Sequence, residues 1–363
     1  MLTSGLIGLP MAGKTTFFNL LTRSQAETSS FYSGKTDTNR GTAIIPDDRL
    51  DYLSHLCSPR RTTYAQLEVV DLVGLVRGAS EGLGIGNAYL SQVRTVDALI
   101  HVVRVFRNPD VLHIEGEIDP LRDIETINLE LLLADLEMIK KRIERIEGSK
   151  KKTEQQLIEL SILNRILEGL NEEKTVHSLR LSEEESTYFK SFGLLTEKPM
   201  ILVANLDEEQ LRSGSYPQKE VLHRYARDKG MTLLEICAQA EMEISQLSPD
   251  DQQEFLKELG ISEPGISLLA RSIYKQLNLI SFFTIGDDEV KAWTIKKGTS
   301  ARSAAGKIHS DLERGFIRAE VVKFSALKEL GSMSRVKEKG LFRLEGKDYT
   351  IMDGDVVNIR FNV

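Results

Sequence analysis

The segment Gly8-Leu9-Pro10-Met11-Ala12-Gly13-Lys14-Thr15 fits the pattern G-x-x-x-x-G-K-[ST] of a phosphate-binding loop. The short segment 4–7 before it ends in two apolar residues and is predicted to form a buried strand, and residues 16–22 are predicted to form a helix. This order points backbone N–H groups and a helix N-terminus at an anion, with the Lys14 ammonium near the outer phosphates and the Thr15 hydroxyl able to hold Mg2+. An ordinary strand-to-helix turn is the alternative, but strand, loop and helix all agree with the motif. We therefore expect a nucleotide to contact Leu9, Pro10, Met11, Ala12, Gly13, Lys14, Thr15 and Thr16.

The composition is that of a globular protein. The 363 residues are 41% hydrophobic and 28% charged, which predicts two or three domains with substantial cores. No apolar run approaches the ~20 residues of a membrane span, and no secretory signal is evident. Cys57 and Cys237 lack a metal-type spacing, which suits a reducing cytoplasm, and Cys237 is expected to be a small buried hydrophobe. The net charge of -7 gives no overall reason to expect nucleic-acid binding, but it leaves room for a local basic face.

The pattern of apolar residues predicts an α/β domain interrupted by two long helices. Strand-like and helical runs alternate in the first third of the chain and resume near residue 198, as a parallel sheet requires. Between them, residues 124–146 hold no Gly or Pro, and a second helical run follows a polar break at 148–152. We expect residues 1–121 and 198–277 to form one domain, 122–197 a helical insertion, and 278–363 a compact α+β domain.

The apolar residues of the first long helix recur at three- and four-residue spacing. They are Leu129, Leu132, Leu133, Leu136, Ile139, Ile143 and Ile146. Such a stripe predicts one buried face, and the charged residues between its members are expected to form a solvated face. Contact with a partner through the basic residues is the alternative.

A second segment of the nucleotide site is predicted at Asp71-Leu72-Val73-Gly74, which ends a strand-like run. Asp71 can hold Mg2+ through water, and the N–H of Gly74 can sense a γ-phosphate; a strand-ending turn without this role is the alternative. The next residue is Leu75, where many GTPase switches carry a Gln that orients the attacking water. A leucine side chain forms no hydrogen bond, so we expect slow intrinsic hydrolysis.

A base-binding segment is predicted at Asn205-Leu206-Asp207-Glu208. In the guanine-reading pattern N-K-x-D, the Asp accepts two hydrogen bonds from guanine, whereas Glu208 is one methylene longer and Leu206 replaces the Lys. A site that misplaces this pair loses selectivity for guanine, so adenine becomes the expected base, with Asn205 at the base edge. An ordinary loop after a core strand is the alternative. The second wall of the base pocket is expected to comprise Ile236, Cys237 and Ala238.

Together these segments closely resemble the YchF (Obg-like ATPase) family of the TRAFAC P-loop NTPases, over nearly the whole chain. The resemblance also rests on Leu75-Val76-Arg77-Gly78-Ala79-Ser80, Gly82-x-Gly84-x-Gly86-Asn87, Asp123-Ile124-Glu125-Thr126-Ile127-Asn128, Ala292-Trp293-Thr294-Ile295, Ala305-Gly306-x-Ile308-His309, Arg314-Gly315-Phe316-Ile317-Arg318-Ala319-Glu320-Val321 and Arg343-Leu344-Glu345-Gly346-Lys347-Asp348-Tyr349. It implies a P-loop G domain of the α/β class, in which helices cover both faces of a mostly parallel sheet. It also implies a coiled-coil insertion and a C-terminal TGS (ubiquitin-like) domain. The implied activity is hydrolysis of ATP at least as good as that of GTP, in association with ribosomes or translation.

The resemblance assigns a role to His113 and exposes two departures from the family pattern. His113 aligns with a mobile-loop histidine implicated in hydrolysis, so we expect it to act in catalysis with Lys14; a merely solvated histidine is the alternative. Met11 replaces an Asn that helps coordinate K+ in related switches, and a thioether is a poor ligand for a hard cation. In switch I, Lys35 falls on the expected Mg2+-binding Thr, a departure that a divergent paralogue would explain. The expected metal ligands are Thr15, Asp71 and, after a register shift, Thr36, with Ser33 as the other substitute.

The C-terminal domain carries a mild excess of positive charge. Residues 278–363 hold fifteen Lys or Arg against twelve Asp or Glu, and Lys307, His309, Arg314 and Arg318 are expected to lie near one another. The residues alone leave RNA contact and a solvated face equally open, and the resemblance favours RNA or ribosome contact. The leading hypothesis is an ATP-dependent molecular switch whose C-terminal domain and helical insertion contact a ribosomal partner. A nucleotide-binding scaffold with little hydrolysis and a GTP-specific ribosome-assembly factor are the alternatives.

Overall fold

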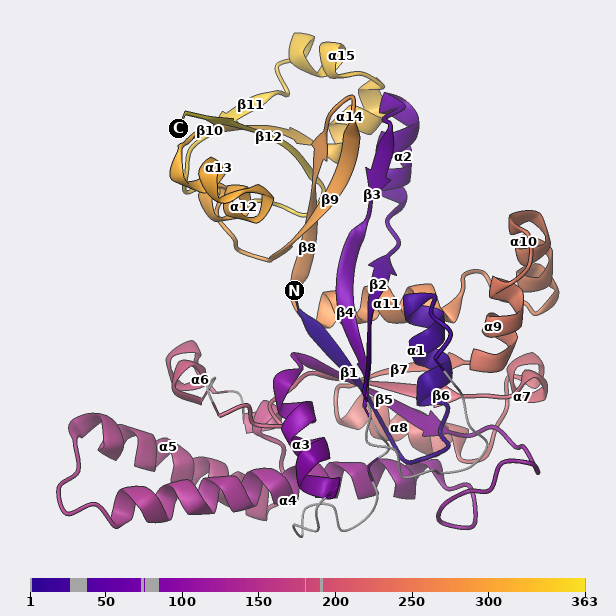
Figure 1. The fold of residues 1–363 in the computed structure, drawn as a ribbon, viewed down its shortest axis with the longest axis vertical. Coiled ribbons are helices and arrows are strands. Elements are labelled where there is room, and N and C mark those ends of the chain that lie inside the picture. Colours follow the sequence, from indigo (N-terminus) through magenta and orange to yellow (C-terminus); the bar gives the residue numbers. More distant parts are fainter. Residues whose placement is uncertain are drawn as a thin grey trace. The chain divides into compact units, whose positions relative to one another are not determined.

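The computed structural model describes residues 2–26, 38–72, 75, 85–179, 181–189 and 192–362. It divides into two compact units (Figure 1). The first unit comprises Met1–Thr42 and Glu68–Leu269, and the second comprises Ala43–Leu67 and Ala270–Val363. Among the described residues, no helix is both long and apolar enough to cross a membrane.

The sheet of the first unit confirms the predicted α/β class. Its strands are β1 (Thr3–Ile7), β2 (Asn39–Ile45), β4 (Ala65–Asp71), β5 (Ala98–Arg104), β6 (Met200–Asn205) and β7 (Thr232–Ile236). They lie in the order β2-β4-β1-β5-β6-β7, and β4, β1, β5, β6 and β7 run parallel to their neighbours. The carboxyl ends of β1, β5, β6 and β7 therefore share one edge, where ligands bind in open α/β sheets.

Helices surround this sheet (Figure 1). They are α1 (Lys14–Thr22), α3 (Ile85–Thr95), α7 (Glu208–Ser213), α8 (Lys219–Asp228), α9 (Ala238–Ser245), α10 (Pro249–Glu258) and α11 (Gly265–Gln276). One core cluster joins Ile7 and Leu99 of the sheet to Val93 of α3, and a second joins Val103 to Leu222 of α8. Burial of these apolar side chains is the main force that holds the helices on the sheet.

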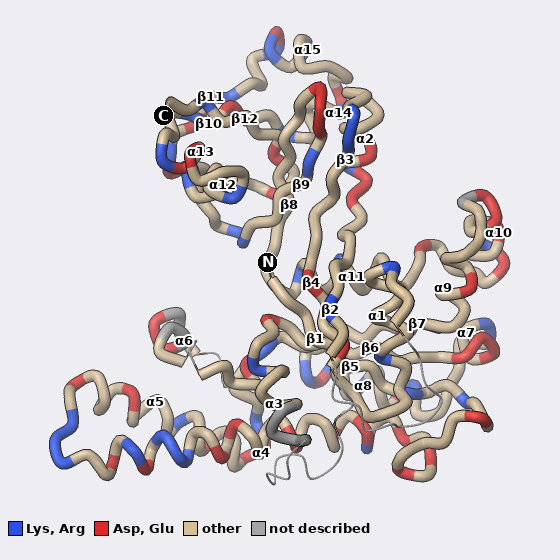
Figure 2. The backbone as a smooth tube through the Cα atoms, viewed as in Figure 1, with Lys and Arg blue, Asp and Glu red and all other residues tan. Residues whose placement is uncertain are grey.

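The predicted helical hairpin is present as α4 (Pro120–Glu147) and α5 (Glu154–Asn171). Asp119 caps α4, whose first residue is a proline, and Thr153 and Gln156 form a capping box at the start of α5. A short 3-10 helix η2 (Val176–Leu179) and α6 (Glu183–Phe189) follow. Figure 2 shows acidic and basic residues alternating along both long helices, and Arg142 of α4 pairs with Glu159 of α5 at 2.6 Å. This pattern agrees with a solvated charged face.

The single apolar stripe predicted for α4 is partly wrong. Leu129 and Leu133 are 47% and 37% exposed. Leu132 and Ile139 do pack against α5, but α4 changes the face it buries along its length. Its N-terminal half buries Ile127 and Leu131 against the sheet instead. The sequence of α4 does not reveal where the buried face changes, because that change depends on which neighbour each half of the helix packs against.

The second unit is an α+β structure around a mixed sheet. Its strands are β3 (Arg61–Thr63), β8 (Leu279–Ile285), β9 (Glu289–Lys296), β10 (Phe316–Lys323), β11 (Arg343–Glu345) and β12 (Asp355–Phe361), in the order β11-β10-β12-β8-β9-β3. The pairs β8/β9, β10/β12 and β10/β11 are antiparallel, whereas β12/β8 and β3/β9 are parallel. Its helices are α2 (Asp48–Cys57), α12 (Ala301–Ile308), α13 (Ser310–Arg314), α14 (Phe324–Leu330) and α15 (Met333–Glu338).

The expected domain boundaries need two corrections. Residues 43–67, expected in the nucleotide-binding domain, belong to the second unit. There β3 adds an edge strand beside β9, and Arg49 of α2 forms an ion pair with Asp353 at 2.8 Å. The second boundary falls inside α11 rather than after it, because Tyr274 donates a hydrogen bond to the carbonyl of Ile280 in β8.

The basic residues singled out in the C-terminal domain are partly neutralised. Lys307 lies in α12, Arg314 in α13 and Arg318 in β10. Asp311 lies 2.6 Å from the guanidinium of Arg314 and 3.5 Å from the imidazole of His309. A carboxylate between two of these side chains weakens the attraction of the cluster for a phosphate backbone.

Candidate nucleotide-binding site

The loop between β1 and α1 has the backbone shape that its two motif glycines allow. Gly8 has φ +143°, and a Cβ there would lie 2.3 Å from the carbonyl oxygen of Val102 in β5. Gly13 has φ +95°, and a Cβ there would lie 2.3 Å from Nδ2 of Asn205. Met11 also lies in the left-handed region, with φ 65°. The loop thus turns tightly against β5 and β6, at the edge where the sheet's carboxyl ends meet.

Lys14 is held inside this loop. Its Nζ donates hydrogen bonds to the carbonyl oxygens of Gly8 at 3.2 Å and Leu9 at 2.8 Å, and the residue is only 7% exposed. Burial lowers the pKa of Lys14 to about 8, against a smaller opposing effect of the Asp71 carboxylate. The ammonium therefore sits at the loop with weak carbonyl partners that an anionic phosphate would outcompete.

Thr15 and Asp71 meet as a magnesium site requires. The Thr15 hydroxyl donates to Oδ2 of Asp71 at 2.8 Å, although the two residues are far apart in the sequence. Burial raises the pKa of Asp71, and hydrogen bonds from Thr15 and Asn39 and the charge of Lys14 oppose this. Asn39, at the start of β2, was not predicted. Thr36 and Gly74 lie outside the described residues.

The oxygen donors fit Mg2+ better than a transition metal. Within the described ranges, no group of three or more His, Cys, Asp or Glu side chains could hold a metal ion by itself. One hydroxyl and one carboxylate beside a phosphate-binding loop are the usual protein share of a magnesium site, the remaining ligands being phosphate oxygens and water.

Asn205 bridges two loops of the site. Its Nδ2 donates to the carbonyl oxygen of Ala12 at 3.0 Å, and its Oδ1 accepts from the backbone N–H of Ala238 at 3.2 Å. These bonds tie the phosphate-binding loop to the start of α9. The predicted contact of Asn205 with the base edge competes with these bonds, so the geometry favours a positioning role. Leu206 is buried in the core, as its apolar side chain requires.

A cavity of about 940 Å³ opens beside these loops. Its wall comprises Met11, Gly13 and Thr16 from the first loop, residues 106–108 and Val111 after β5, residues 205–210, 213 and 215–217 after β6, and Cys237, Ala238 and Gln239 after β7. Its size suits a nucleotide, since small-molecule sites span roughly 300–1,000 Å³. Glu208 lines it with a side chain 49% exposed, 3.8 Å from Arg212. Burial raises the pKa of Cys237 to about 11, as expected of an unreactive buried thiol.

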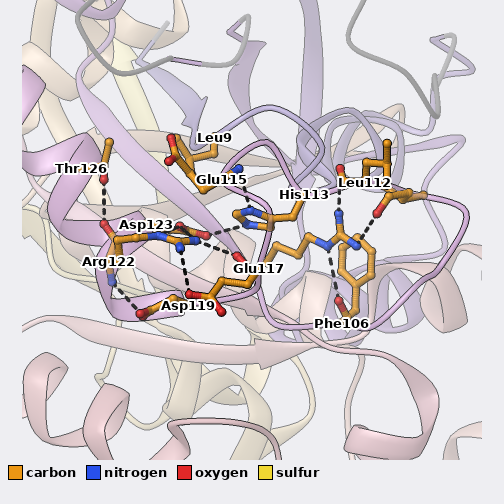
Figure 3. A network of polar contacts seen from close by, with 12 residues as sticks. Leu9, Phe106, Leu112, His113, Glu115, Glu117, Asp119, Arg122, Asp123 and Thr126 are labelled. Carbon is orange, nitrogen blue, oxygen red and sulfur yellow. Dashed lines mark hydrogen bonds and ion pairs between the residues drawn. The ribbon is translucent and has the colours of Figure 1, made fainter.

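His113 is enclosed rather than solvated (Figure 3). Its Nε2 lies 2.9 Å from Oδ2 of Asp123, its Nδ1 accepts from the backbone N–H of Glu115 at 3.2 Å, and its side chain is 5% exposed. The guanidinium of Arg104, at the end of β5, donates to carbonyl oxygens of the same loop. The alternative of a solvated loop histidine is therefore wrong.

Leu75 contributes backbone rather than side chain to the site. Its N–H donates to the carbonyl oxygen of Gly8 at 3.3 Å. Its side chain is 1% exposed and packs in the core cluster that contains Ile7 and Leu9. This residue supplies no group that could orient water.

Comparison with known proteins places this geometry in a family. One family model, described as a 50S ribosome-binding GTPase, matches residues 3–143, and a YchF GTPase C-terminal model, described as a protein of unknown function (DUF933), matches residues 279–362. The chain is similar to the ribosome-binding ATPase YchF of Bacillus subtilis, with 44% identity over 100% of both chains. It is also similar to Obg-like ATPase 1 of Caenorhabditis elegans, with 40% identity over 99% of this chain and 91% of that one. The chain belongs to the YchF family. The solved structure of the Schizosaccharomyces pombe YchF GTPase agrees, with a TM-score of 0.88 and 31% identity over 99% of this chain and 97% of that one.

Several site residues of this YchF-family protein escaped the sequence analysis. They are Asn39, Arg104, Phe106, Arg107, Asn108, Val111, Tyr216 and Asp123. A signal for some of them was available. The polar run that begins at Arg107 follows a strand next to that of the phosphate-binding loop, and such loops form the ligand crevice of an α/β sheet. Nothing in the sequence itself paired Asp123 with His113.

The buried lysine of this YchF-family site predicts proton uptake on nucleotide binding. In the free protein the pKa of Lys14 is about 8, and phosphate oxygens in place of carbonyls should raise it. Binding of a non-hydrolysable Mg–ATP analogue should therefore take up about half a proton at pH 8 and about a tenth at pH 7, with affinity falling as the pH rises above 8. Calorimetry in buffers of different ionisation enthalpy measures this number, and equal uptake at both pH values would contradict it.

Proposed function

We propose that this YchF-family chain is an ATP-dependent molecular switch that hydrolyses ATP slowly and associates with ribosomes. The observation that carries the proposal is the meeting of the Lys14 ammonium, the Thr15–Asp71 pair and the cavity at one edge of the sheet. Relatives that match this chain along its whole length are named ribosome-binding ATPases. Such a switch works in the cytoplasm, where its nucleotide and its partner occur.

The residues of the first loop bind and orient the triphosphate in this proposal. Lys14 exchanges the carbonyls of Gly8 and Leu9 for phosphate oxygens, and the backbone N–H groups at the start of α1 face the same anion. Thr15, Asp71 and Thr36 hold Mg2+, which when bound supplies charge neutralisation at the outer phosphates. The N–H of Gly74 senses the γ-phosphate.

Catalysis by His113 explains how a site with Leu75 can still hydrolyse ATP. The buried Leu75 side chain cannot orient water, whereas a neutral imidazole can hydrogen-bond to a water molecule and orient it. His113 lies on the loop after β5, whose first residues line the cavity. The loop after β5 therefore both lines the cavity proposed for the nucleotide and carries His113. The thioether of Met11, which lines the cavity, is a poor ligand for K+, so added K+ should not stimulate turnover.

Base choice depends on residue 208 in this proposal. Calorimetry with non-hydrolysable analogues should show ATP binding at least as tightly as GTP, and Glu208→Asp should shift the ratio of the two affinities about tenfold toward GTP. Glu220→Asp makes the same change on the exposed face of α8 and should leave the ratio unaltered. GTP binding much more tightly than ATP in the unmodified protein would favour the alternative of a GTP-specific assembly factor.

A measurement of ATP hydrolysis distinguishes the proposed switch from the alternative of a nucleotide-binding scaffold. Steady-state turnover of ATP should be slow in the purified protein and faster with added ribosomes. Binding without turnover under both conditions would favour a scaffold, and turnover of several per second without a partner would contradict the role given to Leu75. We assign contact with the ribosome to the C-terminal TGS domain, which lies within the second unit, and to the helical insertion, residues 122–197, whose two-helix hairpin has a core of its own.

A further inference from the structure

Both ring nitrogens of His113 are occupied in this structure. Nδ1 accepts a hydrogen bond from the backbone N–H of Glu115, so Nδ1 carries a lone pair and no proton. The proton of the neutral ring is therefore on Nε2, which donates to Oδ2 of Asp123 at 2.9 Å. No nitrogen is left to contact a water molecule.

The acceptor of this hydrogen bond is held rigidly. Oδ1 of Asp123 accepts from Nε of Arg122 at 3.1 Å and from its Nη2 at 2.9 Å, and the carboxylate side chain is 5% exposed. Asp123 lies in the first turn of α4, which is capped by Asp119 through the N–H of Arg122. Both oxygens are thus paired in a fixed direction, and the carboxylate can follow His113 only if α4 moves.

The loop that carries His113 is held at a second point by Arg104. This guanidinium donates to the carbonyl oxygens of Val111 at 2.8 Å and of Asn108 and Leu112 at 3.4 Å, and it stacks 4.4 Å from the ring of Phe106. Arg104 is almost completely buried. Displacing the loop would leave a buried cation without these hydrogen-bond acceptors, which is unfavourable. Arg104 therefore stabilises the loop in the position seen here.

We propose that Asp123 and Arg104 hold His113 in a resting position, and that Asp123 is a positioning residue whose release of Nε2 must precede contact of the imidazole with the attacking water (Figure 3). The proposal rests on the catalytic role given above to His113. Asp123 is also on the 28-residue helix whose other end forms the hairpin. A partner that binds the hairpin and shifts α4 would act on this contact directly.

The test compares Asp123→Asn with Glu125→Gln. Both replace a carboxylate by an amide on the first turns of α4, but Glu125 is exposed and Asp123 is buried. Single-turnover hydrolysis at saturating Mg–ATP without ribosomes should be at least about threefold faster in Asp123→Asn, with unchanged nucleotide affinity. The Glu125→Gln rate should not change. The gain in rate should vanish in the double variant Asp123→Asn with His113→Ala. In the single variant Asp123→Asn, stimulation by ribosomes should be smaller than in the unmodified protein, because His113 is already partly released from residue 123.

A second measurement does not depend on activity. Side-chain 15N spectra of the histidine-labelled protein, assigned with His113→Ala, should show the Nε2–H tautomer for His113, and faster exchange of the Nε2 proton with water in Asp123→Asn. Slower hydrolysis in Asp123→Asn would overturn the proposal, since Asp123 would then orient His113 for catalysis. An unchanged rate would overturn it too. If His113→Ala hydrolyses ATP normally, the catalytic role of His113 fails, and the spectra then report a contact that is purely structural.

Discussion

Replacement of Lys14 by Met should weaken binding of Mg–ATP by at least about 100-fold. The variant loses charge-assisted hydrogen bonds to the outer phosphates, and a loss of about 3 kcal/mol corresponds to this factor. Calorimetry with a non-hydrolysable analogue measures the change. Binding within a few fold of the unmodified protein would contradict the role given to Lys14.

The same substitution should not destabilise the nucleotide-free protein. The pKa of Lys14 in the fold is about 8, below the 10.5 of an unfolded chain, so the fold disfavours the charged form at neutral pH. This costs up to about 3 kcal/mol below pH 8, and the cost disappears as the pH rises from 8 toward 10.5. The Lys14→Met variant removes this cost, but it leaves the carbonyl oxygens of Gly8 and Leu9 without their hydrogen-bond donor. Chemical denaturation at pH 7 should show equal or higher stability.

Lys198→Met provides the matched control. Lys198 also donates from a partly buried ammonium to two backbone carbonyls, those of Arg94 and Val96. Burial lowers its pKa in the same direction. It precedes β6, however, and so lies at the opposite edge of the sheet from the cavity. Its replacement should leave nucleotide affinity unchanged, which separates loss of a phosphate contact from loss of a buried charge.

Replacement of Gly13 by Ala should abolish nucleotide binding and destabilise the first unit by at least about 2 kcal/mol. The added Cβ would lie 2.3 Å from Nδ2 of Asn205, and φ at this position is +95°. The side chain of Asn205 cannot move aside without loss of hydrogen bonds, because its amide donates to the carbonyl oxygen of Ala12 and accepts from the backbone N–H of Ala238. Either these bonds or the loop must break, and both changes misplace the backbone N–H groups that face the phosphates.

Gly230→Ala isolates the effect of backbone strain alone. Gly230 also has a positive φ, +63°, but a Cβ there would meet nothing within 4 Å. Its replacement should cost about 1 kcal/mol and leave nucleotide affinity intact. Calorimetry and thermal unfolding of both variants check the pair. Tight binding of Mg–ATP by Gly13→Ala would show that the contact with Asn205 is not needed.

The strands and the loops that carry the chemistry could be predicted because their signals are local. The order of strand, Gly8 to Thr15 and helix is a contiguous pattern, and the buried runs that became β5 and β6 are continuous stretches of apolar residues. A local pattern does not say which other segment of the chain a strand or helix packs against. Residues 43–67 have ordinary strand and helix signals, but only the pairing of β3 with β9 assigns them to the second unit.

By itself, the sequence determined that the chain has a phosphate-binding loop, a Leu at the position of the catalytic Gln and a Glu at the fourth position of the base-reading segment. Only the tertiary structure decided what Asn205, Arg104 and Asp123 do. Each acts through a hydrogen bond to a group that another element brings near, so its role depends on distances that no spacing along the chain encodes. The pairing of Asp123 with His113 exists because the loop after β5 folds back onto the first turn of α4.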